Sequence, residues 1–316
     1  MKLGTLEIRP GEKQSGVLRV EGCGHELPLT VIRGGEGETV LVTAGIHSAE
    51  YVGIQAGIEL ARELAPEQLR GTVILAPLVN VSGFAHRTMS TVYEDQKNLN
   101  REFPGTPSGT PAEQICHAIV TELLSRADVY IDLHSGDGYE ALHPYAYYVG
   151  PVEKSVRERA FQIARRVEAE YLVESPLTTG GAYNHASGMG IPSVLIERGG
   201  GGLWSRAEVE ADKRDVRRIL AYLGVLEAPP EAGEPVRDQL VLREAVYETA
   251  PETGCWYPAL RPGDRFARGT VLGEVRDCFG ERLHTCVARA DGVVLYQTAS
   301  LPVLKDGPMV AYGVLP

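Results

Sequence analysis

Residues 39–50 read Thr39-Val40-Leu41-Val42-Thr43-Ala44-Gly45-Ile46-His47-Ser48-Ala49-Glu50. The first six form the nearly continuous apolar run that is typical of a strand covered on both faces. Apolar residues then recur at helical spacing over residues 50–64, at Val52, Ile54, Ala56, Ile58, Leu60 and Leu64. A buried strand followed by a helix is the first half of a βαβ unit, so this stretch predicts an α/β fold.

The same alternation continues along the chain. We expect strands at 72–79, 129–133 and 193–196, and helices at 111–124, 152–170 and 207–223. Pro111 and Ser205 stand where helices favour proline and an N-cap residue. The first 35 residues alternate apolar and polar side chains between glycine-rich turns, which indicates edge strands. Residues 37–225 should therefore form a mainly parallel sheet covered by helices.

The pattern changes near residue 228. Residues 228–235 form a linker rich in proline, glycine and glutamate, and beyond it only short alternating runs occur. These runs predict an all-β unit whose turns resemble those of the biotinyl/lipoyl barrel sandwich. Its one lysine, Lys305, lies near the chain end, which disfavours a carrier role. We therefore expect a catalytic α/β domain over 1–227 and a smaller barrel-sandwich-like β domain over 236–316.

Composition restricts the class of partner. The 316 residues are 43% hydrophobic, enough for a substantial core, and carry a net charge of −11, which argues against a nucleic-acid partner. We expect no membrane span, because no apolar run approaches about 18 residues, and no signal peptide. The five scattered cysteines form no disulfide pattern. A cytoplasmic protein acting on small molecules is expected.

Two strand ends supply side chains that bind metals. His47 and Glu50 follow the strand at 39–44, and His134 ends the strand at 129–133 within Ile131-Asp132-Leu133-His134-Ser135-Gly136. Parallel strands place ligands at one edge of the sheet, so these side chains should converge. Two histidines and a glutamate are a ligand set of catalytic zinc that leaves a position for water. Asp132 points to the same side as His134 and is a candidate partner for that imidazole or the water.

Two further segments suggest substrate chemistry. Arg101, preceded by Asn100 in a long loop, offers a planar guanidinium that matches a carboxylate, although it would also serve to brace the loop. Glu197 ends the strand at 193–196 and is a candidate general base. An ion pair with Arg198 is the structural alternative, which the opposite facing of adjacent strand residues disfavours.

The chain resembles the succinylglutamate desuccinylase/aspartoacylase family, a branch of the zinc carboxypeptidase superfamily, over residues 37–225. The shared marks are Gly45-Ile46-His47-Ser48-Ala49-Glu50, Asn98-Leu99-Asn100-Arg101 with Phe103-Pro104-Gly105, Asp132-Leu133-His134-Ser135-Gly136, and Glu197. The family also carries a C-terminal β domain. The resemblance implies a zinc-carboxypeptidase-like fold.

The resemblance also implies roles for individual residues. His47, Glu50 and His134 would bind one zinc ion per chain, and Glu197 would be the general base. Asn100 and Arg101 would hold the substrate carboxylate. Arg87 would polarise the scissile carbonyl, although Met89 occupies the second position of a pair that is often basic in the family.

These observations lead to a zinc-dependent deacylase of a small N-acyl amino acid, in which metal-activated water attacks the amide. A metallocarboxypeptidase acting on peptide C-termini shares the same residues and remains the alternative. A non-catalytic binding protein would not need Glu197. Two weaker hypotheses are a metal group of Cys278, His284 and Cys286, and substrate recognition by the polar segment 183–185. Homo-oligomerisation stays open.

Overall fold

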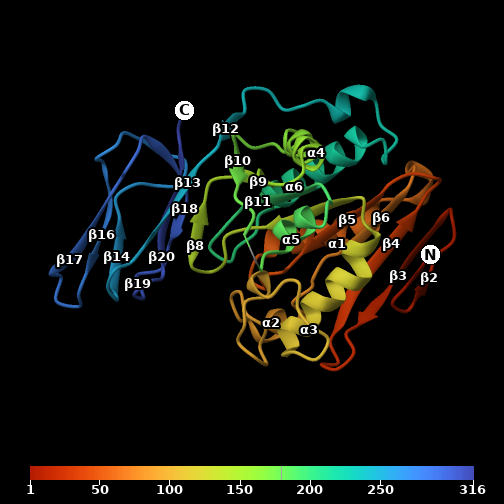
Figure 1. Cartoon of the computed structure of the whole chain (residues 1–316), viewed down its shortest axis with the longest axis horizontal. Helices are drawn as coiled ribbons and strands as arrows, with labels where there is room; N and C mark the ends of the chain where they lie inside the picture. Colours follow the sequence, from red (N-terminus) through yellow and green to blue (C-terminus); the bar gives the residue numbers. More distant parts are fainter. Residues whose placement is uncertain (179) are drawn as a thin grey trace.

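A nine-stranded sheet forms the centre of the protein in a computed structural model that describes residues 1–178 and 180–316 (Figure 1). Its strands follow the order β12-β10-β9-β11-β7-β5-β6-β4-β3. Their bounds are Glu12–Arg19 (β3), Glu26–Arg33 (β4), Thr39–Ala44 (β5), Thr72–Ala76 (β6), Val129–His134 (β7), Tyr145–Val149 (β9), Tyr171–Ser175 (β10), Ser193–Glu197 (β11) and Leu240–Leu242 (β12). Neighbours from β6 through β11 pair in parallel, which confirms the mainly parallel sheet.

Helices cover both faces of this sheet. One face packs against α1 (Tyr51–Glu63), α4 (Lys154–Ala164) and α6 (Arg206–Tyr222), whose apolar residues share a core with the strands. The other face packs against α3 (Pro111–Ala118) and α5 (Ala182–Gly188). The short helix α2 (Val81–His86) lies in the connection after β6. The result is a three-layer α/β/α arrangement.

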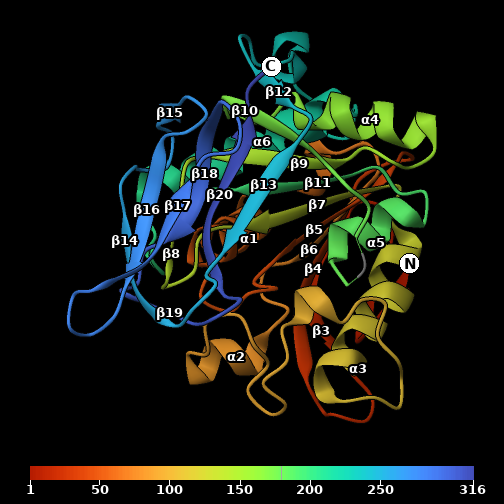
Figure 2. The same cartoon turned by 60° about the vertical axis from the view of Figure 1, so that its left-hand side comes forward.

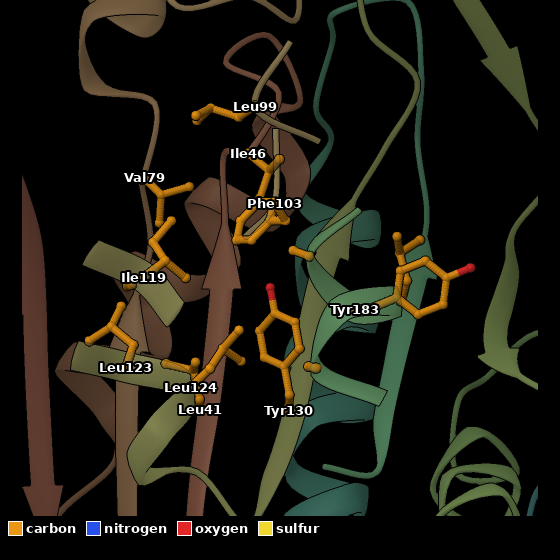
Figure 3. Close-up of a cluster of buried hydrophobic side chains, with 14 of the residues drawn as sticks. Leu41, Ile46, Val79, Leu99, Phe103, Ile119, Leu123, Leu124, Tyr130 and Tyr183 are labelled. Carbon is orange, nitrogen blue, oxygen red and sulfur yellow. The ribbon is translucent and has the colours of Figure 1, made fainter. Parts of the chain in front are cut away.

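Alternation along the buried strands divides the core in two. In β5, Leu41 joins the cluster beneath α3, whereas Val40 and Val42 join the cluster beneath α1. Figure 3 shows the first cluster, with Ile119, Leu123 and Leu124 beside Leu41. Successive strand residues point to opposite faces, so a strand covered on both sides must be apolar throughout.

The C-terminal residues form a two-sheet β-sandwich. One sheet has the order β13-β20-β18-β15 and the other β17-β16-β14-β19. The strands are Ala245–Thr249 (β13), Gly254–Pro258 (β14), Arg265–Phe266 (β15), Val271–Arg276 (β16), Arg282–Val287 (β17), Gly292–Thr298 (β18), Pro302–Val303 (β19) and Pro308–Val314 (β20). Buried Trp256 and Tyr312 belong to a separate core between them. The expected smaller all-β unit is confirmed.

Two strands cross the expected division between the domains. β8 (Glu140–Leu142) comes from the α/β part but pairs with β18 of the sandwich. β12, which follows the linker, pairs with β10 at the edge of the large sheet. Figure 2 shows β8 beside the strands of the sandwich. The two parts are therefore joined by shared sheets as well as by the linker.

Several elements differ from the sequence-based expectation. The helix expected at 152–170 ends at Ala164, because β10 begins at Tyr171. The helix expected at 111–124 is regular only to Ala118 and continues as a π-helical turn, Ile119–Leu123, and a 3-10 turn, Leu124–Arg126. β9 runs antiparallel to its neighbour β11. Within the described part of the chain, no helix is long and apolar enough to cross a membrane.

Candidate active site

The site lies at the carboxyl ends of β5, β7 and β11. β5 and β7 are neighbours in the middle of the sheet. The chain continues from β5 to β6 on one side of this pair, and β11 lies next to β7 on the other side. The gap between β5 and β7 is therefore a topological switch point. Such points leave a crevice for ligands in open α/β sheets. Gly45 makes the turn after β5 with a φ of +67°, and a Cβ atom there would lie 2.9 Å from Leu78. This turn positions His47 and Glu50 next to His134 at the end of β7.

His47, Glu50 and His134 converge as expected. Glu50 Oε1 lies 2.6 Å from His47 Nδ1, and Glu50 Oε2 lies 2.9 Å from His134 Nδ1. One ligand atom from each residue lies within 4.8 Å of the others, and this is the only such group of three among the described residues. The two Nδ1 atoms and the carboxylate therefore face a common point.

Further contacts orient these three side chains. Asp132 Oδ2 lies 3.2 Å from His134 Nε2, and Asp132 Oδ1 accepts a hydrogen bond from the Thr43 hydroxyl at 2.7 Å. His47 Nε2 lies 3.1 Å from Asn98 Oδ1. A histidine whose Nε2 hydrogen points to an oxygen keeps Nδ1 free for a metal. Asp132 therefore lies next to His134 as expected, although the two atoms form a charge contact and not an aligned hydrogen bond. Asn98 forms the corresponding hydrogen bond with His47.

The charges of this group also favour a cation. Burial opposes ionisation of Glu50, but His47 and His134 outweigh it and lower its pKa to about 2. Burial likewise opposes protonation of His134, but Asp132 and Glu50 outweigh it and raise the pKa of the imidazole well above its usual value. The two carboxylates thus favour positive charge at this point, which a zinc ion bound by the neutral imidazoles and Glu50 would supply.

Glu197 lies beside this group and forms no ion pair with any residue that the structure describes. It ends β11, where it is the sheet neighbour of His134 in β7. Arg198 instead donates to Asp212 at 2.9 Å and Asp215 at 2.5 Å on α6. Burial raises the pKa of Glu197 well above its usual value, and Glu50 and Glu140 add to this, although His134 opposes it. The structure therefore excludes the alternative ion pair between Glu197 and Arg198.

Asn100 and Arg101 reach the same cavity from the loop before α3. The side chain of Asn98 caps the turn Leu99–Arg101 by accepting from the Asn100 amide at 2.8 Å. Asn100 Oδ1 accepts from the Ala182 amide at 2.9 Å, which fixes this loop to α5. Arg101 donates one Nη1 hydrogen to the carbonyl of Asn100 and has no carboxylate partner among the described residues. Its remaining donors are available to an anion.

A cavity of about 400 Å³ connects these residues. Its lining includes His47, Glu50, Asn100, Arg101, His134, Glu140, Tyr145, Tyr147, Tyr183, Asn184, Glu197, Tyr247 and Tyr296. Tyr247 and Tyr296 come from β13 and β18, so the C-terminal sandwich forms part of the wall. The Tyr147 and Tyr247 hydroxyls lie 3.2 Å apart across this boundary. The sandwich thus covers one side of the cavity.

Arg87 is not brought to the cavity. It ends α2 in a left-handed conformation with a φ of 57°, and its side chain lines a separate hollow with Phe84 and Trp204. The cavity that holds the His47, Glu50 and His134 group does not include Arg87 among its lining residues. The expectation that Arg87 polarises a substrate carbonyl is therefore not supported by its position.

The two weaker hypotheses have different outcomes. Tyr183 and Asn184 line the cavity from α5, where a loop was expected, whereas His185 is not among the lining residues. Cys278 is exposed and Cys286 is buried, and the described residues hold no metal-binding group at His284.

Sequence reasoning missed several lining residues. Glu140, Tyr145, Tyr247 and Tyr296 were not singled out, because strand pairing over long distances brings them to the cavity. Asn98 belongs to the motif Asn98-Leu99-Asn100-Arg101, which suggests substrate binding only for Asn100 and Arg101. Its position two residues before Asn100, typical of a capping asparagine, was the available signal.

Comparisons with known proteins agree with this arrangement. The model of the succinylglutamate desuccinylase/aspartoacylase catalytic domain matches residues 36–223. A protein of Halomonas elongata, named N-alpha-acetyl-L-2,4-diaminobutyric acid deacetylase, is 31% identical over 284 residues, which cover 86% of this chain and 82% of that protein.

Solved structures extend the similarity to the whole chain. The product-bound ectoine utilization protein EutE (DoeB) from Ruegeria pomeroyi has a TM-score of 0.88 at 28% identity, covering 98% of each chain. A succinylglutamatedesuccinylase/aspartoacylase from Rhodobacter sphaeroides has a TM-score of 0.85 at 27% identity, again covering 98% of each chain. The chain belongs to the succinylglutamate desuccinylase/aspartoacylase family.

Proposed function

We propose that this protein is a zinc-dependent amidohydrolase that removes the acyl group from a small N-acyl amino acid. One observation carries the proposal: the His47, Glu50 and His134 group shares a cavity with the unpaired carboxyl of Glu197. His47, Glu50 and His134 would hold one zinc ion per chain. The family and the deacetylase from Halomonas elongata support the acyl amino acid as substrate class.

The residues of the chain divide the reaction between them. Zinc, when bound, would polarise the amide carbonyl and acidify the attacking water. Glu197 accepts the proton of that water and returns it to the nitrogen of the leaving amine. Burial raises the pKa of Glu197, and a carboxylate with a raised pKa is a stronger base towards the proton of the water.

Arg101 and Asn100 would hold the carboxylate of the amino acid. The guanidinium matches a carboxylate in shape and charge, and the contact of Asn100 with α5 keeps the pair in place. Because the anchor and Glu197 line one small cavity, the scissile bond should lie near the anchored carboxylate. An N-acyl amino acid has this arrangement.

A metallocarboxypeptidase is the second candidate, because it would use the same groups. We favour the deacylase, since Tyr247 and Tyr296 of the sandwich close one side of the cavity. A peptide would need an open groove that continues beyond the scissile bond.

The test is a hydrolysis screen of N-acetyl, N-formyl and N-succinyl amino acids with zinc added, in which the released amino acid is measured. We expect release from at least one acyl series, with acetyl the first to examine because of the Halomonas elongata relative. Absence of release from all three series would contradict the proposal.

A further inference from the structure

One carboxylate of the cavity has no place in the chemistry described so far. Three acids line it, and two of them have roles: Glu50 in the metal group and Glu197 as the base. The third is Glu140, which lies on β8. Apart from the two histidines, Arg101 is the only basic side chain among the described lining residues. If Arg101 holds the substrate carboxylate, Glu140 is left without a cation.

The surroundings of Glu140 confirm that it is uncompensated. Among the described residues, its carboxylate accepts no hydrogen bond and forms no ion pair within 4.0 Å. Burial, together with the negative charges of Asp137 and Glu50, raises the pKa of Glu140 to about 7, against a smaller opposing effect of His47 and His134. A half-buried carboxyl group that faces a cavity without a partner gains most from a ligand that brings a positive charge.

The pairing of β8 fixes Glu140 against the sandwich. Glu140 lies opposite Thr298 of β18, and Leu142 lies opposite Tyr296, so strand register rather than a loop sets the position of the carboxylate. Glu140 therefore belongs to the rigid wall formed where the two parts of the protein meet. A side chain held in this way can select among ligands.

Tyrosine rings provide the rest of the wall. Tyr145, Tyr147, Tyr183, Tyr247 and Tyr296 all line the cavity. The Tyr145 and Tyr147 ring centroids lie 5.0 Å apart, and those of Tyr147 and Tyr183 lie 6.2 Å apart. Aromatic faces attract ammonium groups, so a carboxylate beside aromatic walls is a combination suited to an alkylammonium ion.

The same lining residues disfavour a second carboxylate on the substrate. An acyl amino acid with an acidic side chain or a dicarboxylic acyl group would bring a second negative charge to a cavity where Arg101 is already engaged. That charge would have to lie among tyrosines or near Glu140, where it would be repelled.

We propose that Glu140 is a specificity-determining residue that binds a protonated amine on the substrate side chain. The preferred substrates are then N-acylated diamino acids whose second amine is free. This inference rests on the proposed function, and it assigns Glu140 to recognition, not to metal binding or proton transfer.

The experiment compares matched substrates. Nα-acetylated diamino acids with two or three side-chain methylenes are each paired with the N-acetyl amino acid in which a methyl group replaces the ammonium. The kcat/KM of each pair is measured for the wild type and for Glu140→Gln, together with zinc content. Asp137→Asn is the control, because it removes a nearby negative charge that does not line the cavity.

We expect the wild type to prefer the ammonium member of a pair. Glu140→Gln should lower kcat/KM for that member at least about tenfold, as expected for a lost charge-assisted hydrogen bond. The neutral member should change by less than about twofold, and zinc content should stay the same. Asp137→Asn should retain the preference, and Glu140→Asp should restore part of it.

Two results would overturn the inference while leaving the proposed function intact: no preference within the pairs in the wild type, or an equal loss for both members in Glu140→Gln. If no N-acyl amino acid is hydrolysed, the proposed function fails, and calorimetry with free diamino acids then tests Glu140 separately. Binding that Glu140→Gln abolishes supports the role of Glu140, and absence of binding to the wild type contradicts it.

Discussion

Glu197 and Glu50 are carboxyl groups of the same cavity, yet their contacts assign them different chemistry. Glu50 lies between two imidazoles, which lower its pKa to about 2 and keep it ionised as a ligand must be. Glu197 accepts no hydrogen bond within the described part of the chain, and burial raises its pKa. A ligand acts through a lone pair and a base through a proton, so amide substitutions should separate the two roles.

Glu197→Gln should keep zinc bound and lower turnover by roughly 10² to 10⁴, the usual contribution of a general base. Glu50→Gln should lose metal affinity first, because an amide replaces the anionic ligand. Zinc content and single-turnover rate on one substrate check both variants. Loss of zinc from Glu197→Gln, or a rate close to wild type, would show that Glu197 is not the base.

Arg101→Lys should lower kcat/KM by a factor that corresponds to about 1 to 3 kcal/mol of lost binding free energy. Lysine keeps the positive charge but loses the two-pronged contact with a carboxylate. Steady-state kinetics on one N-acyl amino acid measures the effect. The control is a substrate with an amidated α-carboxyl group, which should be poor for the wild type and little affected by the variant. Equal rates on the free acid and the amide would show that no carboxylate anchor exists.

The convergence of His47, Glu50 and His134 was predictable from sequence because these residues follow buried strands, and parallel strands bring their ends together. The position of Glu197 next to His134 was predictable for the same reason. Arg87 was not predictable in this way, since its side-chain direction depends on the left-handed turn after α2. The positions of Glu140 and Tyr296 in the cavity were not predictable either. These residues meet through pairing between β8 and β18, which are more than 140 residues apart in the chain.

The contact between β11 and α6 places two carboxyl groups on one guanidinium. Arg198 donates to Asp212 and Asp215, and all three side chains are buried. Burial raises the pKa of Asp212 to about 8, while Arg198 opposes the shift. Asp212 Oδ2 has no hydrogen-bond partner among the described residues. Asp212 therefore holds a proton near neutral pH.

This proton makes stability depend on pH. An aspartate in an unfolded chain titrates near about 4, so the native state binds more protons between about pH 4 and 8, and the free energy of unfolding falls as pH rises through this window. Asp212→Asn should remove this part of the pH dependence and lower the free energy of unfolding by at most about 1 kcal/mol. Denaturant unfolding of both proteins at several pH values measures it. An unchanged pH dependence in the variant would contradict the assignment.

The long elements were predictable because their periodicity is strong, as in α1 and α6, whose bounds differ little from the expected ranges. The errors concern short segments. Tyr145–Val149 has no flanking pattern that reveals its pairing with β11, and Leu240–Leu242 resembles the β-rich segment that follows. The pairing of such short strands depends on the neighbouring strands of the folded sheet and not on their own sequence.

The sandwich and the α/β part build one cavity between them. β8 pairs with the sandwich, and Tyr247 meets Tyr147 across the boundary. Under the proposed function, this arrangement should limit the length of the substrate. The wild type should release acyl groups from N-acyl amino acids and leave the C-terminal residue of blocked tripeptides uncleaved. Mass spectrometry of the products checks this, and efficient cleavage of the tripeptides would favour the carboxypeptidase.

Zinc titration of the metal-free protein is the decisive test of the metal site at His47, Glu50 and His134. Chelation should abolish hydrolysis of N-acyl amino acids, and activity should return in proportion to added zinc until about one ion per chain is bound. His134→Ala should show neither tight binding nor recovery, because two protein ligands rarely hold zinc. Full activity in the protein freed of metal, or tight zinc binding in His134→Ala, would contradict the proposed metal site and the function built on it.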